Sequence, residues 1–271
     1  MNKVTTGRVA FIGGGNMAGA LIGGLVRSGH DPAALVVVEP AEAQRERLAT
    51  EHGVVAQAAA DARLAGCGLV VWAVKPQLFA EAAAPCAPHV GGALQLSVMA
   101  GVRCASIAAA SGSARVVRSM PNTPALIGQG IAGLYAEPAV SEAERAAAAA
   151  LFAPTGQVLW VEREADLDAV TALSGSGPAY VFYFLEAMMQ AAAEMGLSPE
   201  QGRLLGQATF AGAAALAMRS TLSPTTLREQ VTSKGGTTHA AITSLDADGV
   251  KAAFVKALHA ARARAEELGR G

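Results

Sequence analysis

The stretch Arg8–Val26, RVAFIGGGNMAGALIGGLV, decides how the rest of the chain must fold. A short apolar run at Val9–Ile12 leads into three glycines, and apolar residues at helical spacing follow. This order predicts a strand, a tight turn and a helix N-terminus, in the G-x-G-x-x-A form that binds the pyrophosphate of a dinucleotide. Gly13 would permit the turn, Gly15 the approach of the phosphates, and Ala18 close packing of helix on strand. A glycine turn that only connects a strand to a helix is the alternative that this stretch leaves open.

Length and composition restrict the classes of protein to be considered. The chain has 271 residues, enough for one large domain or for two modest domains, each with its own core. Of these residues 52% are hydrophobic and 16% charged, which suggests that apolar surface is also buried between subunits. The net charge of −1 and the lack of a basic stripe argue against a nucleic-acid partner. Without an apolar run of about eighteen residues or a signal peptide, a cytoplasmic protein that does not enter membranes is expected. The three cysteines lack C-x-x-C spacing, so neither a disulfide framework nor a metal site is expected.

A second strand is expected at Ala34–Val38, and it ends at Glu39. In dinucleotide-binding domains, an acidic residue at the end of the second strand accepts hydrogen bonds from the ribose hydroxyls in the adenosine half of the cofactor. Its carboxylate would repel a 2′-phosphate, which favours NADH. Arg45 and Arg47 follow closely and could neutralise that phosphate, so NADPH stays open as the alternative.

Further strands are expected at Leu69–Val74, at Leu94–Met99 and from Val116 onward. Five strand–helix alternations predict an α/β fold with a Rossmann-like, doubly wound parallel sheet. The carboxyl ends of such strands form the edge on which open α/β folds bind ligands. Lys75 directly follows the strand expected at Leu69–Val74 and is placed to meet the phosphate or ribose of a cofactor; a solvated lysine is the alternative.

From about Glu137 the pattern becomes mainly helical, apart from one last strand at Gly156–Val161. Helices are expected over Asp166–Leu173, Pro178–Met195, Pro199–Met218, Pro224–Val231, Thr238–Leu245 and Gly249–Leu268. The second and third of these are apolar on nearly every face, which predicts burial in a subunit interface. The sequence therefore predicts an N-terminal dinucleotide-binding domain over residues 1–163 and an all-α C-terminal domain over residues 164–271.

Three polar loops are expected at Met120–Pro124, Ser174–Pro178 and Val231–Ala241, and the last two contain glycine. In the last of them a double glycine precedes Thr237 and Thr238 at the start of a helix. Exposed N–H groups and hydroxyls that converge there suit a small carboxylate. An ordinary helix cap is the alternative.

Six segments, in this order along nearly the whole chain, resemble those of pyrroline-5-carboxylate reductases: GGGNMAGALIGG, AVKP, SVMAGV, RSMPNTPALIGQG, DAVTALSGSGPAY and VTSKGGTTHAAI. The resemblance implies that NADPH or NADH reduces 1-pyrroline-5-carboxylate to L-proline, the last step of proline biosynthesis, by hydride transfer to the imine carbon. It also implies self-association through a helical C-terminal dimerisation domain, as a dimer or as a pentamer of dimers.

The resemblance also implies which residues form the site. With Glu39 added from its place after the second strand, the cofactor-binding residues are expected to be Ile12, Gly13, Gly14, Gly15, Asn16, Met17, Glu39, Ala73, Val74, Lys75, Pro76, Val98, Met99, Ala100 and Asn122. The substrate-binding residues are expected to be Glu164, Ser233, Gly236, Thr237 and Thr238. Thr238 is implied to hydrogen-bond the ring nitrogen and to hold or relay its proton, which makes it the expected catalytic residue. His239 is an alternative acid, or a structural residue beside a helix start, and no metal ion is expected.

Two other classes of function are compatible with a Rossmann half and a helical half. A β-hydroxyacid dehydrogenase would need a catalytic lysine in a helix, and no lysine of this chain has a matching context. A dinucleotide-binding regulatory protein would bind the cofactor without oxidising it, and the intact Ser233–Thr238 segment argues against that function.

Overall fold

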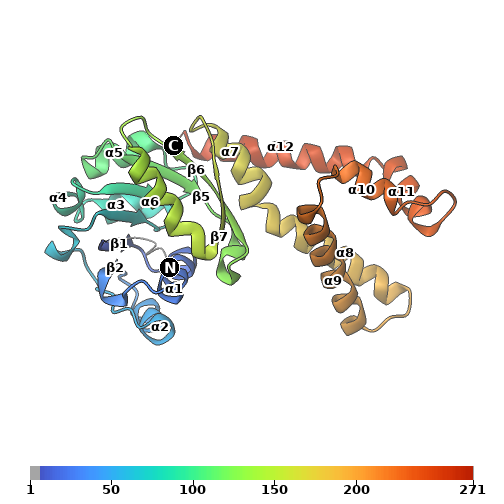
Figure 1. Cartoon of the computed structure of the whole chain (residues 1–271), viewed down its shortest axis with the longest axis horizontal. Helices are drawn as coiled ribbons and strands as arrows, with labels where there is room; N and C mark the ends of the chain where they lie inside the picture. The colour runs from blue at the N-terminus through green and yellow to red at the C-terminus, as the bar shows by residue number, and fades with distance from the viewer. Residues whose placement is uncertain (1–6, 271) are drawn as a thin grey trace. The chain divides into compact units, whose positions relative to one another are not determined.

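The computed structural model describes residues 7–270. Of these, the residues up to Ser176 and those from Ala261 onward form one compact unit, and Gly177–Ala260 form a second. A seven-stranded sheet, in the order β2-β1-β3-β4-β5-β6-β7, is the centre of the first unit (Figure 1). Its strands are β1 Val9–Ile12, β2 Leu35–Val38, β3 Leu69–Trp72, β4 Leu94–Ser97, β5 Val116–Met120, β6 Gly130–Ala136 and β7 Gly156–Trp160. All neighbouring strands are parallel except β5 and β6.

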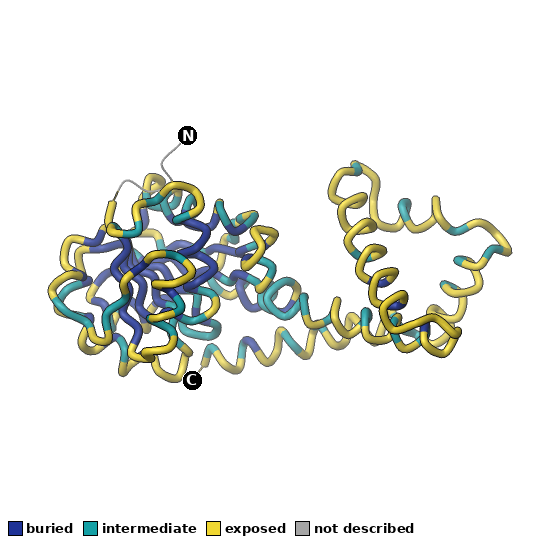
Figure 2. Tube along the Cα trace, turned by 90° about the horizontal axis from the view of Figure 1, so that it is seen from below, coloured by how far each residue is buried: buried dark blue, intermediate teal, exposed yellow. Residues whose placement is uncertain are grey.

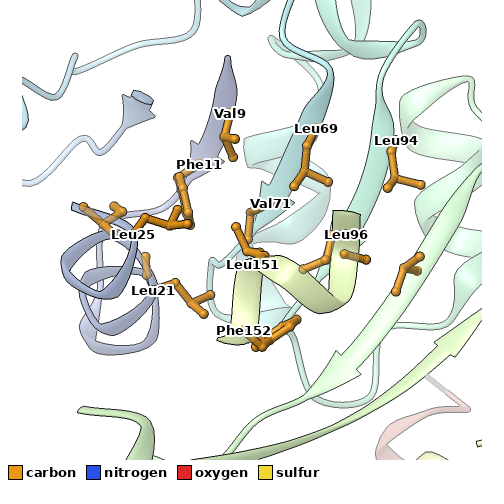
Figure 3. Packing of buried hydrophobic residues seen from close by; sticks show 14 of the residues in the cluster. Val9, Phe11, Leu21, Leu25, Leu69, Val71, Leu94, Leu96, Leu151 and Phe152 are labelled. Carbon is orange, nitrogen blue, oxygen red and sulfur yellow. The ribbon is translucent and has the colours of Figure 1, made fainter. Parts of the chain in front are cut away.

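Helices cover both faces of this sheet, which confirms the doubly wound fold. They are α1 Asn16–Arg27, α2 Glu42–His52, α3 Phe79–Ala83, α4 Ala87–Val90, α5 Cys104–Ser111, α6 Glu142–Phe152 and α7 Asp166–Val170. On one face Phe11 and Val71 pack with Leu21 of α1 and Phe152 of α6 (Figure 3). On the other face a second cluster surrounds Trp72. The strands β1 to β4 are buried throughout because helices cover the sheet on both sides. Their side chains are apolar except for Gln95 and Ser97 of β4, and Gln95 accepts a hydrogen bond from the indole N–H of Trp72 at 2.9 Å.

The strand β6 was not expected from the sequence. It pairs antiparallel with β5 and parallel with β7, so it joins the last strand to the sheet. Its sequence GIAGLYA carries two glycines, which weaken a strand pattern. Gly133 is required by packing, because a Cβ there would lie 2.6 Å from Cγ1 of Val170 in α7.

The prediction of a loop at Ser174–Pro178 is wrong, because the chain stays helical there. A π-helical turn over Thr171–Gly175 follows α7, and α8 begins at Gly177. The N–H group of Ser176 donates to the carbonyl oxygen of Thr171 at 2.8 Å, which closes the wide turn. The glycines and serines of this segment indicated a loop. Packing requires Gly175 instead, because a Cβ there would lie 2.5 Å from Cε of Met120.

The second unit contains helices, as expected. They are α8 Gly177–Glu194, α9 Pro199–Arg219, α10 Pro224–Gln230, α11 Thr237–Ala247 and most of α12 Val250–Leu268. Ser198 and Ser223 cap α9 and α10, and in each case a proline occupies the first helical position. Gly202 of α9 lies against Ala192 of α8, which allows the two helices to pack closely.

Most of the second unit is exposed when the chain is considered alone, as the yellow tube in Figure 2 shows. In α8 and α9 the buried residues are Ala192, Gly202 and Gly206. The large apolar side chains exposed on the same two helices are Val181, Phe182, Tyr183, Met188, Leu204, Leu205, Leu216 and Met218. An apolar surface of this kind marks a protein–protein interface. Within residues 7–270, no helix combines the length and the apolar character that crossing a membrane requires.

Candidate active site

The residues expected on the cofactor side are brought together at one edge of the sheet. They follow the carboxyl ends of five strands, β1 to β5, which are parallel to one another. Backbone hydrogen bonds tie these segments together: Gly13 N donates to Val38 O at 2.8 Å, and Ala73 N donates to Ile12 O at 2.8 Å. The edge lies where open α/β sheets bind nucleotides.

The glycine loop has the shape that a pyrophosphate requires. Gly13 has φ +100°, and a Cβ there would lie 2.6 Å from the carbonyl oxygen of Ala73. Gly15, the N-cap of α1, faces open space, so the phosphates can approach its backbone. No side chain among residues 7–270 caps α1, which leaves the first N–H groups of a 12-residue helix available to an anion.

Glu39 has contacts that the sequence analysis missed. Its Oε2 accepts a hydrogen bond from Gly14 N at 2.7 Å, and its Oε1 accepts one from Ala41 N at 2.8 Å. The residue is buried, and its carboxylate holds the backbone of the glycine loop through the Gly14 hydrogen bond. The run of three glycines was the only available signal, because a side chain at position 14 would meet Cγ of Glu39.

The two arginines of α2 also reach this region. Arg47 donates to Oδ1 of Asn16 at 3.0 Å and to the carbonyl oxygen of Gly14 at 3.2 Å. Arg45 donates to the carbonyl oxygens of Glu39 and Pro40. The structure therefore holds one carboxylate and two guanidinium groups near the end of β2.

The remaining positions expected to bind the cofactor differ in how far they are exposed. Lys75 is exposed at the start of the turn Pro76–Leu78, while Val98 and Ala100 are half-buried after β4. The Oδ1 atom of Asn122 accepts a hydrogen bond from Ile131 N at 3.0 Å. That bond places the amide of Asn122 between β5 and the start of β6.

Glu164 lies in the first unit, in a network of polar groups. Its Oε1 accepts hydrogen bonds from Cys104 N and from Nη1 of Arg118, both at 2.7 Å. Burial of Glu164 raises the pKa of its carboxyl group, but the Cys104 and Arg118 bonds more than offset this, so the pKa lies below its ordinary value. The carboxylate therefore joins the segment before α7 to β5 and to the N-terminus of α5.

We expect Glu164→Gln to lower the free energy of unfolding by about 2 kcal/mol at pH 7, because a charged hydrogen-bond acceptor is lost. A lowered pKa in the folded state stabilises the protein above the unfolded pKa, and this contribution disappears as the pH falls through the folded value. The difference in the free energy of unfolding between the variant and the wild type should therefore shrink below about pH 4. Denaturant titrations at pH 7 and at low pH measure it.

Glu142→Gln is the matched control, since Glu142 is 94% exposed and its partner Arg145 is 3.8 Å away. Its effect should stay below about 0.5 kcal/mol at both pH values. A difference between Glu164→Gln and wild type that does not change with pH would contradict the role given to the ionised carboxylate.

Cys104, Glu137 and Glu164 form a cluster whose ligand atoms lie within 4.8 Å of one another. A metal ion would need the thiolate of Cys104, and burial, followed by the charge of Glu164, raises the pKa of this thiol. The guanidinium group of Arg118 already balances the charge of Glu164. These residues do not fit a metal site.

The segment expected to bind substrate belongs to the second unit. Gly235 has φ +75°, and Gly236, whose N–H donates to Ser233 O at 3.0 Å, is the N-cap of α11. Thr237 begins the helix and Thr238 is half-buried. In the part of the chain that the structure describes, no side chain caps this 11-residue helix, so its first N–H groups are available to a carboxylate.

Comparison with known proteins identifies related chains over both units. Residues 164–268 match the family model described as pyrroline-5-carboxylate reductase dimerisation, and residues 8–101 match NADP oxidoreductase coenzyme F420-dependent. The pyrroline-5-carboxylate reductase of Pseudomonas aeruginosa is 45% identical over 268 residues, which cover 98% of each chain. The one from Vibrio alginolyticus is 39% identical over 269 residues, with 96% of this chain and 97% of the relative covered.

Solved structures of pyrroline-5-carboxylate reductases are also similar to this chain. A pyrroline-5-carboxylate reductase from Coxiella burnetii is 36% identical with a TM-score of 0.90, covering 97% of this chain and 99% of that one. The enzyme from Plasmodium falciparum, solved with NADP bound, is 26% identical with a TM-score of 0.87 and covers 97% and 98%. The fold and the resemblance inferred from six short segments are thus confirmed over the whole length. This chain belongs to the pyrroline-5-carboxylate reductase family.

Proposed function

We propose that this chain reduces 1-pyrroline-5-carboxylate to L-proline with NADPH or NADH. Residues 1–163 would form the cofactor domain and residues 164–271 the domain for dimerisation and substrate binding. The observation that carries the proposal is the uncapped N-terminus of α11, with Thr237 and Thr238 at its start, in a chain of this family. A carboxylate and a protonated ring nitrogen are the groups that such a site would recognise.

Each part of the chain has a separate role in this reaction. The bound nicotinamide supplies the hydride that the imine carbon accepts. The loops Ile12–Met17, Ala73–Pro76 and Val98–Ala100 would hold the cofactor, with Asn122 and Glu39 at its borders. The N–H groups around Gly236 and the hydroxyls of Ser233 and Thr237 would hold the substrate carboxylate, with Glu164 on the substrate side. Thr238 would hydrogen-bond the ring nitrogen, and positioning of the two reactants would supply most of the rate.

Steady-state assays test this function directly. The imine should be reduced with NADH and with NADPH, and 3-hydroxy acids should not be oxidised. A preference for NADH would support Glu39 as the acceptor of the ribose hydroxyls, whereas equal or better use of NADPH would assign the adenosine end to Arg45 and Arg47. A chain that binds either cofactor and reduces no imine would be the regulatory protein considered above.

Thr238→Ala is expected to lower kcat about tenfold or more, because the hydroxyl that holds the proton on the ring nitrogen is lost. Thr243→Ala, in the same helix, is the matched control and should leave kcat unchanged; its hydroxyl donates to the carbonyl oxygen of His239. Thr238→Ser should restore most of the rate. Wild-type kinetics for Thr238→Ala would remove this residue from the mechanism and leave His239 as the remaining candidate.

The assembly and location form part of the same proposal. The exposed apolar side chains of α8 and α9 would be covered in a dimer, and a pentamer of dimers is the larger assembly to be tested by light scattering. A cytoplasmic location agrees with the three cysteines, Cys67, Cys86 and Cys104, which are free and buried.

A further inference from the structure

Arg103 connects the loop after β4 to a distant part of the first unit. It is the N-cap residue of α5, and its Nη2 lies 2.8 Å from Oδ2 of Asp168 in α7. The side chain of Asp168 is 5% exposed and that of Arg103 is 24% exposed. The ion pair is therefore largely removed from solvent, so salt screens its attraction much less than that of a surface pair.

The same side chain also reaches the residue that follows α12. Nε of Arg103 donates to the carbonyl oxygen of Gly269 at 3.3 Å. Nearby, Gly101 has φ +78°, and a Cβ there would lie 3.1 Å from the carbonyl oxygen of Leu268. The loop after β4 thus contacts both the segment through which the chain leaves the first unit and the segment through which it returns.

We propose that Arg103 is a positioning residue that holds the Val98–Ala100 loop in the geometry that hydride transfer requires, by tying it to Asp168 and Gly269. This inference rests on the proposed function, because that function places Val98–Ala100 beside the nicotinamide. The start of the loop is fixed separately, since Met99 N donates to Oγ of Ser97 at 3.1 Å. At its end, the Arg103 side chain ties the loop to Asp168 and to Gly269.

A variant without this side chain keeps the start of α5 in place. The N–H group of the next residue, Cys104, donates to Glu164 at 2.7 Å independently of Arg103. What is lost is the connection of the loop to α7 and to the end of α12. A displacement of about 1 Å in a positioning element costs as much as a hundredfold in rate, so the effect should appear in kcat.

Three variants of the full-length protein test this inference, with kcat expressed per active site. Arg103→Ala should lower kcat for the imine about tenfold, while the Kd of NADPH stays within about twofold, because the phosphate loop is untouched. Arg103→Lys should recover part of the rate, since an ammonium group reaches Asp168 but lacks the planar fork that also binds Gly269. Gly269→Ala should lower kcat severalfold with every charge retained, because a Cβ there would overlap the Arg103 guanidinium.

Arg115→Ala is the matched control. Arg115 likewise joins a carboxylate, Glu144, to a backbone carbonyl, that of Gly92, each at 2.5 Å, within the same unit. Its loss should leave kcat unchanged.

The inference is overturned if kcat of Arg103→Ala stays within twofold of the wild-type value, if Arg115→Ala loses as much, or if NADPH binding falls in parallel with kcat. Should Arg103→Ala not fold, Gly269→Ala decides in the same way. A wild-type protein that reduces no imine would refute the proposed function itself, whereas active wild type with unaffected variants refutes only the role of Arg103.

Discussion

Gly13→Ala is expected to weaken the binding of NADPH and NADH about a hundredfold, which corresponds to roughly 2.7 kcal/mol. A side chain at φ +100° is strained, and its Cβ would lie 2.6 Å from the carbonyl oxygen of Ala73. Neither backbone segment can move alone, because Ala73 N donates a hydrogen bond to Ile12 O and Gly13 N donates one to Val38 O. The glycine loop must therefore shift away from the phosphate position. Quenching of protein fluorescence by the cofactor measures the change in Kd.

Gly29→Ala separates the backbone strain from the clash. Gly29 has φ +93°, but a Cβ there would meet nothing within 4 Å. This variant should lose some stability and keep the cofactor affinity of the wild type. If Gly13→Ala bound either cofactor as tightly as the wild type, the glycine loop would not be the phosphate site.

Gly156→Ala is expected to lower the free energy of unfolding by about 4 kcal/mol, the sum of backbone strain and overpacking. Gly156 begins β7 with φ +146° and ψ −147°, a conformation that essentially only glycine adopts. A Cβ there would overlap the carbonyl oxygen of Gly130 and lie 2.5 Å from its carbonyl carbon. Since these two glycines are paired in the register of β6 and β7, the two strands would have to separate at this end.

The measurement is a denaturant titration at one fixed protein concentration, because self-association contributes to the apparent stability. Gly112→Ala is the control, with φ +71° and no neighbour within 4 Å of a Cβ, and it should cost about 1 kcal/mol. A loss for Gly156→Ala as small as that of the control would show that β6 and β7 tolerate a side chain at this position.

The parts of the fold that depend on local pattern could be predicted from the sequence. The apolar strand before Gly13, the helix that ends at Gly53 with φ +67°, and the Ser-Pro starts of α9 and α10 each carry their signal within a few residues. The strand β6 could not be predicted, because packing rather than strand propensity requires its two glycines: a Cβ at Gly130 would meet the backbone of Ala125 and Thr155, and one at Gly133 would meet Val170.

The same distinction applies to the candidate site. The glycine loop and the start of α11 are continuous segments, so their positions at a sheet edge and a helix N-terminus followed from the sequence. The role of Glu39 in supporting Gly14 and the contacts of Arg47 with the loop depend on side-chain directions across 25 and 33 residues. Arg103 and Gly269 are 166 residues apart, and no local pattern indicates that they meet.

The return of the chain to the first unit determines the order in which this protein can fold during synthesis. The sheet can form once β7 has left the ribosome, but the contacts of Gly101 with Leu268 and of Arg103 with Gly269 require residues made about a hundred positions later. Contacts of such high sequence separation form late, because a long loop must close first. A nascent chain that has just completed its sheet therefore has a nucleotide-binding edge whose β4 loop still lacks its contacts with Leu268 and Gly269, and it acquires its final form only after the helices have been made.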